Sequence, residues 1–204
     1  YRVSQLRSDG YGVALPRPFL PRSGAHVADA LFGAGTCRKL FYRRLEEFPS
    51  VGLCNPGHPE VDFARGVENT SGPLGQGHTM AVGAAIAERF LVARFGEWMA
   101  HKTYAFISDG GVQEEISQGA GRLAGYLGLN NLIMFYDSND IQLSTETGAV
   151  TVEDTAKKYE AWGWSVVTIE GNDPDAIRAA LKAAQTETGK PTLIIGKTIM
   201  GKGA

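Results

Sequence analysis

Cysteine, long apolar runs and net charge are all scarce in this 204-residue sequence. Its two cysteines, Cys37 and Cys54, are too few for a disulfide framework, so we expect incidental thiols in a reducing compartment such as the cytoplasm. No run of about 18 apolar residues is present to span a membrane. The formal net charge of −2 gives no electrostatic reason to expect a nucleic-acid partner. The composition indicates an ordinary globular protein with one sizeable core.

Apolar runs alternate with helical segments from residue 103 onward. Strands are predicted at 103–107, 132–136, 165–169 and 192–196, and helices at 79–95, 115–127, 153–162 and 173–188. The first of these helices is apolar over much of its surface, so we expect it to be well buried. Strands that alternate with helices predict an α/β fold, in which a parallel sheet carries helices on both faces.

Polar residues follow the first two predicted strands, with Asp109 after one and Asn139 after the other. Parallel strands bring their C-terminal ends to the same edge of a sheet, so these two side chains are expected to face each other across one site. Carboxylate and amide oxygens suit Mg²⁺ or Ca²⁺ rather than zinc, and Mg²⁺ often completes its coordination with phosphate oxygens. The alternative is that Ser108, Asp109 and Asn139 only cap the helices that follow them.

Two loops upstream of this region contain further candidate residues. Residues 72–77 form a glycine-rich segment before a helix, where backbone N–H groups can approach a ligand closely. The segment lacks the Lys-Ser/Thr pair of a P-loop, so a nucleoside triphosphate fingerprint does not apply. His58 lies in a turn-rich loop and is either a site residue or a loop histidine that bonds to the backbone.

Asp109 and Gly110, with Asn139 thirty positions after Asp109 and Ile141 two further, resemble the thiamine diphosphate signature, in which a Gly-Asp-Gly motif and a later asparagine bracket a metal. Other segments resemble the transketolase family in particular, namely 57–60, 72–77, 123–125, 154–156 and 197–201. The resemblance covers roughly residues 55–204 in family order. It implies the thiamine diphosphate-binding fold.

For the metal, the resemblance implies Mg²⁺, with Ca²⁺ able to substitute. Its ligands would be the side chains of Asp109 and Asn139 and the backbone carbonyl of Ile141. The cation would bridge to the diphosphate of the cofactor, with the Gly110 backbone nearby. Ser108 stands where the family has a first glycine, which is tolerable if the backbone there needs no positive φ.

Other site residues are implied in the same way. Gly72 and Leu74 match the loop that contacts the rings of thiamine diphosphate. His58 matches a histidine that faces the hydroxyl end of the donor sugar. Glu114 matches an acid in a proton network between the two sites of a dimer, and the alternative for it is an ordinary glutamate at a helix N-terminus.

The implied activity is transketolase, which moves a two-carbon ketol unit from a ketose phosphate to an aldose phosphate in the pentose phosphate pathway. Sugar phosphates would be its substrates, and a homodimer or a partner chain with a pyrimidine-binding domain would complete its site. The alternatives are the small subunit of a split transketolase, or a non-catalytic regulatory or interaction protein on the same fold.

Two parts of the chain are expected to differ. Residues 1–54 are expected to be a poorly matched N-terminal segment, partly disordered or non-native. Residues 55–204 are expected to form the α/β domain that binds thiamine diphosphate and magnesium, truncated at its C-terminal end. We therefore expect the chain alone to show little or no ketol transfer.

Overall fold

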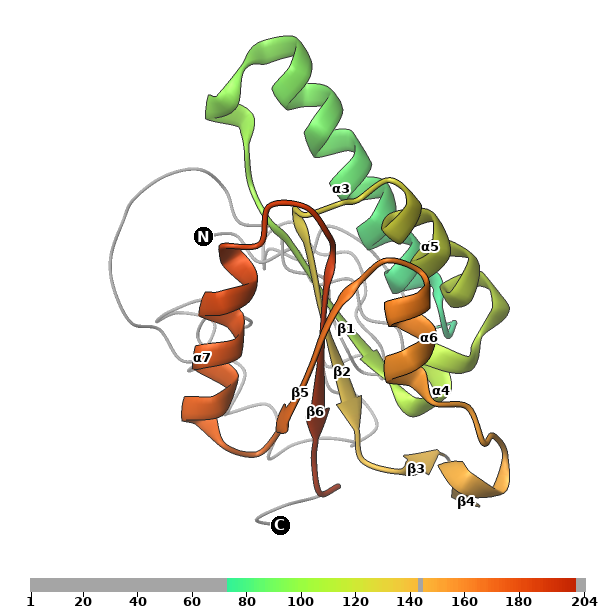
Figure 1. Cartoon of the computed structure of the whole chain (residues 1–204). Coiled ribbons are helices and arrows are strands. Elements are labelled where there is room, and N and C mark those ends of the chain that lie inside the picture. The colour runs from blue at the N-terminus through green and yellow to red at the C-terminus, as the bar shows by residue number, and fades with distance from the viewer. Residues whose placement is uncertain (1–72, 143–144, 201–204) are drawn as a thin grey trace, which may run out of the picture.

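The computed structural model describes residues 73–142 and 145–200 (Figure 1). The predictions for His58, Gly72, both cysteines and residues 1–54 lie outside this part of the chain. In chain order the elements are α3 (Gln76–Phe95), the 3₁₀ helix η2 (Glu97–Met99), β1 (Thr103–Ser108), α4 (Asp109–Gln113), α5 (Glu115–Tyr126), β2 (Leu132–Ser138), β3 (Ile141–Gln142), β4 (Thr145–Glu146), the 3₁₀ helix η3 (Thr147–Ala149), α6 (Thr155–Ala161), β5 (Ser165–Glu170), α7 (Pro174–Gln185) and β6 (Thr192–Lys197).

A parallel sheet forms the centre of the described residues, with strand order β1-β2-β6-β5. The register of β1 on β2 sets Ser108 opposite Asp137, so both strands end at the same edge. β6 pairs in parallel with β2 and with β5. A short antiparallel ribbon of β3 and β4 lies beyond the end of β2. The predicted parallel sheet is confirmed.

Helices cover both faces of this sheet (Figure 1). α3, α5 and α6 pack on one face, where the core contains Ala85, Ile107, Ala124, Tyr159 and Leu193. α7 packs on the other face against a smaller cluster, through Ala180 and Ala184. The central strands are buried on both sides, which explains why they read as continuous apolar runs in the sequence.

The prediction that the first helix is well buried was wrong. α3 buries one face only, formed by Gly77, His78, Ala81, Val82, Ala85 and Glu88. Phe90 is 60% exposed and Phe95 52% exposed. α3 packs on one face of the sheet, and the apolar residues on its opposite side stay exposed. None of the helices in the described ranges is long and apolar enough to cross a bilayer.

The start of α3 also differs from the prediction, because the helix begins at Gln76 rather than at residue 79. Gly75 precedes it in the left-handed region, with φ 83°. A Cβ on Gly75 would lie 2.6 Å from Ile116 Cγ2 and 2.9 Å from Ser117 Oγ. The absence of a side chain therefore allows the loop before α3 to pack directly on the start of α5.

Candidate functional site

The site begins where β1 turns into α4. Ser108 is extended, with φ −99°, and its Oγ accepts a hydrogen bond from the backbone N–H of Gly111 at 3.2 Å. Ser108 is therefore the N-cap of α4, and the backbone at this position needs no glycine. The next residue, Asp109, opens the helix with its side chain fully buried.

Asp109 accepts hydrogen bonds from two neutral donors, one on the neighbouring strand β2 and one in the turn after it. The hydroxyl of Tyr136 donates to Asp109 Oδ1 at 2.5 Å, and the backbone N–H of Asn139 donates to Oδ2 at 3.0 Å. No ion pair of Asp109 occurs in the part of the chain that the structure describes. Burial of a carboxylate without a counter-ion is costly, so this side chain favours a cation beside it.

Tyr136 is held as a permanent donor to this carboxylate. Burial, and then the hydrogen bond with Asp109, raise the pKa of Tyr136 well above its usual range. The hydroxyl therefore stays protonated at any pH near neutrality. Because it always donates, Tyr136 fixes the position of Oδ1 without supplying positive charge.

The turn after β2 carries the second set of oxygens. Asn139 Oδ1 accepts a hydrogen bond from the backbone N–H of Ile141 at 3.0 Å, which holds the side-chain amide over the turn. Between them Asp140 adopts the left-handed region, with φ 62°. A non-glycine residue in that region is uncommon, and such strain occurs often at functional sites. The backbone carbonyl of Asp140 accepts from Thr147 N at 2.9 Å, which ties the turn to η3.

These contacts decide between the two interpretations of the strand-end residues. Ser108 caps a helix, as the capping alternative predicts, but Asp109 and Asn139 do not. Asp109 contacts the turn after β2, and no helix begins at Asn139. The prediction that Asp109 and Asn139 meet at one edge is confirmed, although the atom of Asn139 that reaches Asp109 is its backbone nitrogen.

The potential metal ligands at this edge are oxygen atoms. An aspartate carboxylate, an asparagine amide oxygen and a nearby backbone carbonyl suit a hard divalent cation such as Mg²⁺ or Ca²⁺. No cluster of three or more His, Cys, Asp or Glu side chains occurs among the described residues, so a zinc-type site is not built there. Together with the buried Asp109 carboxylate, which has no ion pair within the described ranges, this donor set fits magnesium.

A cavity of about 720 Å³ adjoins the turn on the side of α6. Gln113, Tyr136 and Ile141 contribute to its wall at the strand ends. Lys197, from the end of β6, also lines it; its Nζ donates to Ser138 Oγ at 2.8 Å and lies 3.5 Å from Asp140 Oδ1. The cavity therefore has a lysine in its wall beside the turn, while Asp109 and Asn139 are not among its lining residues.

The loop before α3 reaches the same region. A Cβ on Gly110 would lie 3.4 Å from Leu74 Cδ1, so Leu74 packs against the start of α4. A Cβ on Gly75 would lie 3.1 Å from Glu114 Cβ. The structure thus brings Leu74, Gly110 and Glu114 together beside Asp109.

Glu114 occupies the joint between α4 and α5. It is the N-cap of α5, but its side chain makes no capping hydrogen bond. Its backbone carbonyl accepts from Gln118 N at 3.1 Å. Glu114 thus lies at a helix N-terminus, as the alternative interpretation has it, and the proton-network role stays a prediction.

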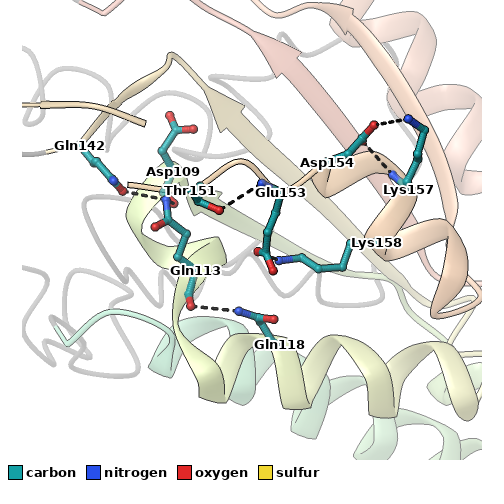
Figure 2. A network of polar contacts seen from close by, with 9 residues as sticks. All are labelled: Asp109, Gln113, Gln118, Gln142, Thr151, Glu153, Asp154, Lys157 and Lys158. Carbon is teal, nitrogen blue, oxygen red and sulfur yellow. Dashed lines mark hydrogen bonds and ion pairs between the residues drawn. The ribbon is translucent and has the colours of Figure 1, made fainter. Parts of the chain in front are cut away.

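Three residues at this site were not singled out from the sequence, namely Tyr136, Gln113 and Gln142. Tyr136 was assigned only to the end of a strand, and its hydroxyl was the available signal, because a buried tyrosine usually pairs its polar tip. Gln113 lies four positions after Asp109, the spacing of neighbours on a helix. Figure 2 shows Gln113 between Asp109 and Gln142.

Comparison with known proteins places the chain beside one family. The family model described as transketolase, thiamine diphosphate binding domain, matches residues 34–204. Transketolase 1 of Pasteurella multocida is 48% identical over 165 residues, which cover 78% of this chain and 25% of that protein. Transketolase 1 of Vibrio cholerae is 47% identical with the same coverage. The chain spans about a quarter of the length of the curated relatives it matches.

Solved structures of transketolases also match this chain. Transketolase from Campylobacter jejuni superposes with a TM-score of 0.70 at 41% identity, over 76% of this chain and 24% of that one. Transketolase from Leishmania mexicana gives a TM-score of 0.70 at 40% identity with the same coverage. The α/β architecture described above therefore matches that of these enzymes.

Proposed function

Because the chain belongs to the transketolase family through its thiamine diphosphate binding domain, we propose that it is the diphosphate-binding part of a transketolase. The activity would be transfer of a two-carbon ketol unit from a ketose phosphate to an aldose phosphate. The observation that carries this proposal is the buried Asp109, which meets the turn at Asn139 and lacks a counter-ion within the described residues. A magnesium ion bound to the cofactor diphosphate would neutralise that charge.

The proposed ligands of the ion are the side chains of Asp109 and Asn139 and the backbone carbonyl of Ile141. When bound, thiamine diphosphate supplies the carbanion chemistry of the reaction. The protein binds and orients it, and Gly110 lets the backbone approach the diphosphate. Calcium is expected to substitute for magnesium, since both accept oxygen ligands.

Four further residues have proposed roles around the reacting groups. Leu74, packed on the start of α4, and Gly72 would contact the cofactor rings. His58 would bind the hydroxyl end of the donor sugar. Glu114 would hold a proton on its carboxylate within the network between two sites. The proximity of Glu114 to Gly75 supports its assignment to the cofactor side of the domain.

We propose a dimer, either of this chain or with a chain that carries the pyrimidine-binding domain. α3 and α5 lie side by side, since Arg89 Nη1 donates to the backbone carbonyl of Leu127 at 2.9 Å. Their outward surface exposes several large apolar side chains, namely Ile86, Phe90, Ile116, Leu123 and Tyr126. An apolar surface of this kind supports contact with another protein. We further propose a cytoplasmic role in the pentose phosphate pathway.

Binding of thiamine diphosphate in the presence of Mg²⁺ tests the proposal. Calorimetry on the 204-residue chain is expected to show saturable binding, and Asp109→Asn is expected to weaken it at least about 100-fold. Loss of a residue that only orients a metal ligand already costs about 10- to 100-fold in affinity. Asp173→Asn is the matched control, because Asp173 caps α7. Equal binding by wild type and Asp109→Asn would contradict the proposed site.

The chain alone is expected to show little or no ketol transfer, because it spans about a quarter of its relatives. A coupled assay with a ketose phosphate and an aldose phosphate checks this. Robust turnover by the purified chain would contradict it. Failure of the wild type to bind the cofactor with Mg²⁺ would instead favour a non-catalytic protein on the same fold.

A further inference from the structure

Gln113, the last residue of α4, links the two segments that carry the proposed cation ligands. Its Nε2 donates to the backbone carbonyl of Asp109 at 3.0 Å and to Oε1 of Gln142 at 2.8 Å (Figure 2). A carboxamide NH₂ has two hydrogens, so both donors of Gln113 are used. One bond secures the α4 turn and the other crosses to β3.

Gln142 lies next to Ile141, one of the proposed cation ligands, so its bond with Gln113 reaches the turn that carries these ligands. Gln142 directly follows Ile141, and these two residues form β3. On the other side of the bridge, Asp109 opens α4. Two hydrogen bonds among the described residues therefore join the two segments, from Asn139 N to Asp109 Oδ2 and between Gln113 and Gln142. They brace the turn near both of its ends.

Gln113 is itself held from α5. The side chain of Gln118 donates through Nε2 to the backbone carbonyl of Gln113 at 3.1 Å. Gln113 is half-buried and lines the cavity next to Ile141. The backbone of Gln113 is thus tied to α5, whereas Gln142 belongs to a two-residue strand.

We propose that Gln113 and Gln142 form a clamp that holds the 139–142 turn against α4, so that the oxygens of Asp109, Asn139 and Ile141 are already placed for a divalent cation. The inference rests on the proposed function for the identity of the ligand. Gln113 is a positioning residue and touches no reacting atom. A site that is ordered before binding loses less conformational entropy on binding, so the clamp raises affinity for the cation and the diphosphate.

Hydrogen exchange in the absence of metal and cofactor tests the clamp on its own. The amides of Asn139 and Ile141 are the probes, because each is hydrogen-bonded within the turn or to Asp109. Gln113→Met and Gln142→Met each keep the side-chain length and remove the bond between the two residues. Gln113→Met also removes the bond to the Asp109 carbonyl, which lies within α4. Each is expected to speed exchange of both amides roughly fivefold, the equivalent of one ordinary hydrogen bond.

Gln185→Met is the matched control, since Gln185 on α7 makes a comparable side-chain bond with the hydroxyl of Tyr104. It is expected to leave exchange at Asn139 and Ile141 unchanged. The double variant Gln113→Met/Gln142→Met is expected to lose less than the two single variants combined, as coupled partners do. Unchanged exchange in both single variants, or equal acceleration in the control, would overturn the clamp.

A Mg²⁺ titration with thiamine diphosphate present gives the functional outcome. Both single variants are expected to require roughly fivefold more Mg²⁺ for half-saturation. An unchanged requirement for Mg²⁺ in a wild type that binds would overturn the inference. If the wild type binds nothing, the proposed function fails, and the exchange rates still decide whether the clamp exists.

Discussion

Two regions of the domain use buried groups in opposite ways. At the site edge, which comprises residues 108–113 and 136–142, the fully buried Asp109 carboxylate is bound by neutral donors alone among the described residues, and one turn residue has positive φ. At the α5–α6 interface, Trp164 Nε1 donates to the carbonyl of Gly121 at 2.8 Å, and the ring of Tyr159 packs 5.1 Å from that of Trp164. The first region is the proposed ligand site, whereas the second is held by close packing and by the paired indole of Trp164, although the Tyr159 hydroxyl has no hydrogen-bond partner among the described residues.

The two regions are expected to govern different properties, with the α5–α6 interface determining folding stability and the site edge determining ligand binding. The α5–α6 interface depends on close approach, because a Cβ on Gly125 would lie only 1.8 Å from the backbone carbonyl oxygen of Trp162. The site edge instead contains a buried carboxylate that has no ion pair within the described residues, and the proposed cation would stabilise the fold when it binds. Changes at the interface should therefore unfold the protein, and changes at the site edge should weaken ligand binding with little effect on folding.

The largest effect is expected from Gly125→Ala. The new methyl group would overlap the Trp162 carbonyl, so the free energy of unfolding is expected to fall by about 3 kcal/mol or more. Urea denaturation followed by tryptophan fluorescence measures it. Gly119→Ala is the control in the same helix, because no atom lies within 4 Å of a Cβ there. It is expected to stabilise the helix by about 0.5–1 kcal/mol. Equal midpoints for the two variants would contradict the contrast.

A smaller effect is expected from pH, through His78 on α3. Burial lowers the pKa of His78 from 6.5 to about 4, and its ring nitrogens have no hydrogen-bond partner in the described part of the chain. Between these two values the unfolded chain binds a proton that the folded chain does not. Stability is therefore complete above pH 6.5 and falls toward pH 4, by at most about 1.4 kcal/mol per pH unit.

The variant His78→Leu isolates this contribution from that of the carboxyl groups. It is expected to flatten the slope of unfolding free energy between pH 6.5 and 4, as followed by urea denaturation at several pH values. An unchanged slope would show that His78 is not the titrating group. A flattened slope would assign the acid sensitivity of folding to α3 rather than to the site edge.

The smallest effect is expected from Asp140→Gly. Glycine adopts positive φ without steric strain but loses more chain entropy on folding, so a net gain of about 0.5 kcal/mol in stability is expected. Asp140→Ala keeps the strain and is expected to lose about 1 kcal/mol. Thermal unfolding measures both. A large loss with glycine would mean that the aspartate side chain, rather than the backbone, holds the turn.

Much of the fold follows from local sequence patterns. The strands β2 and β6 are continuous apolar runs because helices cover both sides, and their positions were predicted to within two residues. The start of α3 was missed because Gln76 and Gly77 follow a glycine-rich loop and look like part of it. The exposed side of α3 was missed because the apolar composition of a helix does not show whether another element covers each of its faces.

The site was predictable as far as topology determines it. Parallel strands bring Asp109 to the turn at Asn139, and the structure confirms that contact. The supporting bonds from Tyr136 and Gln113 were not predictable, because they depend on register and on side-chain direction across elements. The roles of His58 and Gly72 stay predictions, since both lie outside the described residues.

The most direct test of the central idea, that this edge holds a diphosphate through a divalent cation, is equilibrium dialysis of the 204-residue chain with thiamine diphosphate and with thiamine. Each compound is measured with Mg²⁺ and with excess chelator. We predict that thiamine diphosphate is retained only when Mg²⁺ is present and that thiamine, which has no diphosphate, is not retained in either condition. Retention of thiamine diphosphate in chelator, or equal retention of thiamine, would contradict the account.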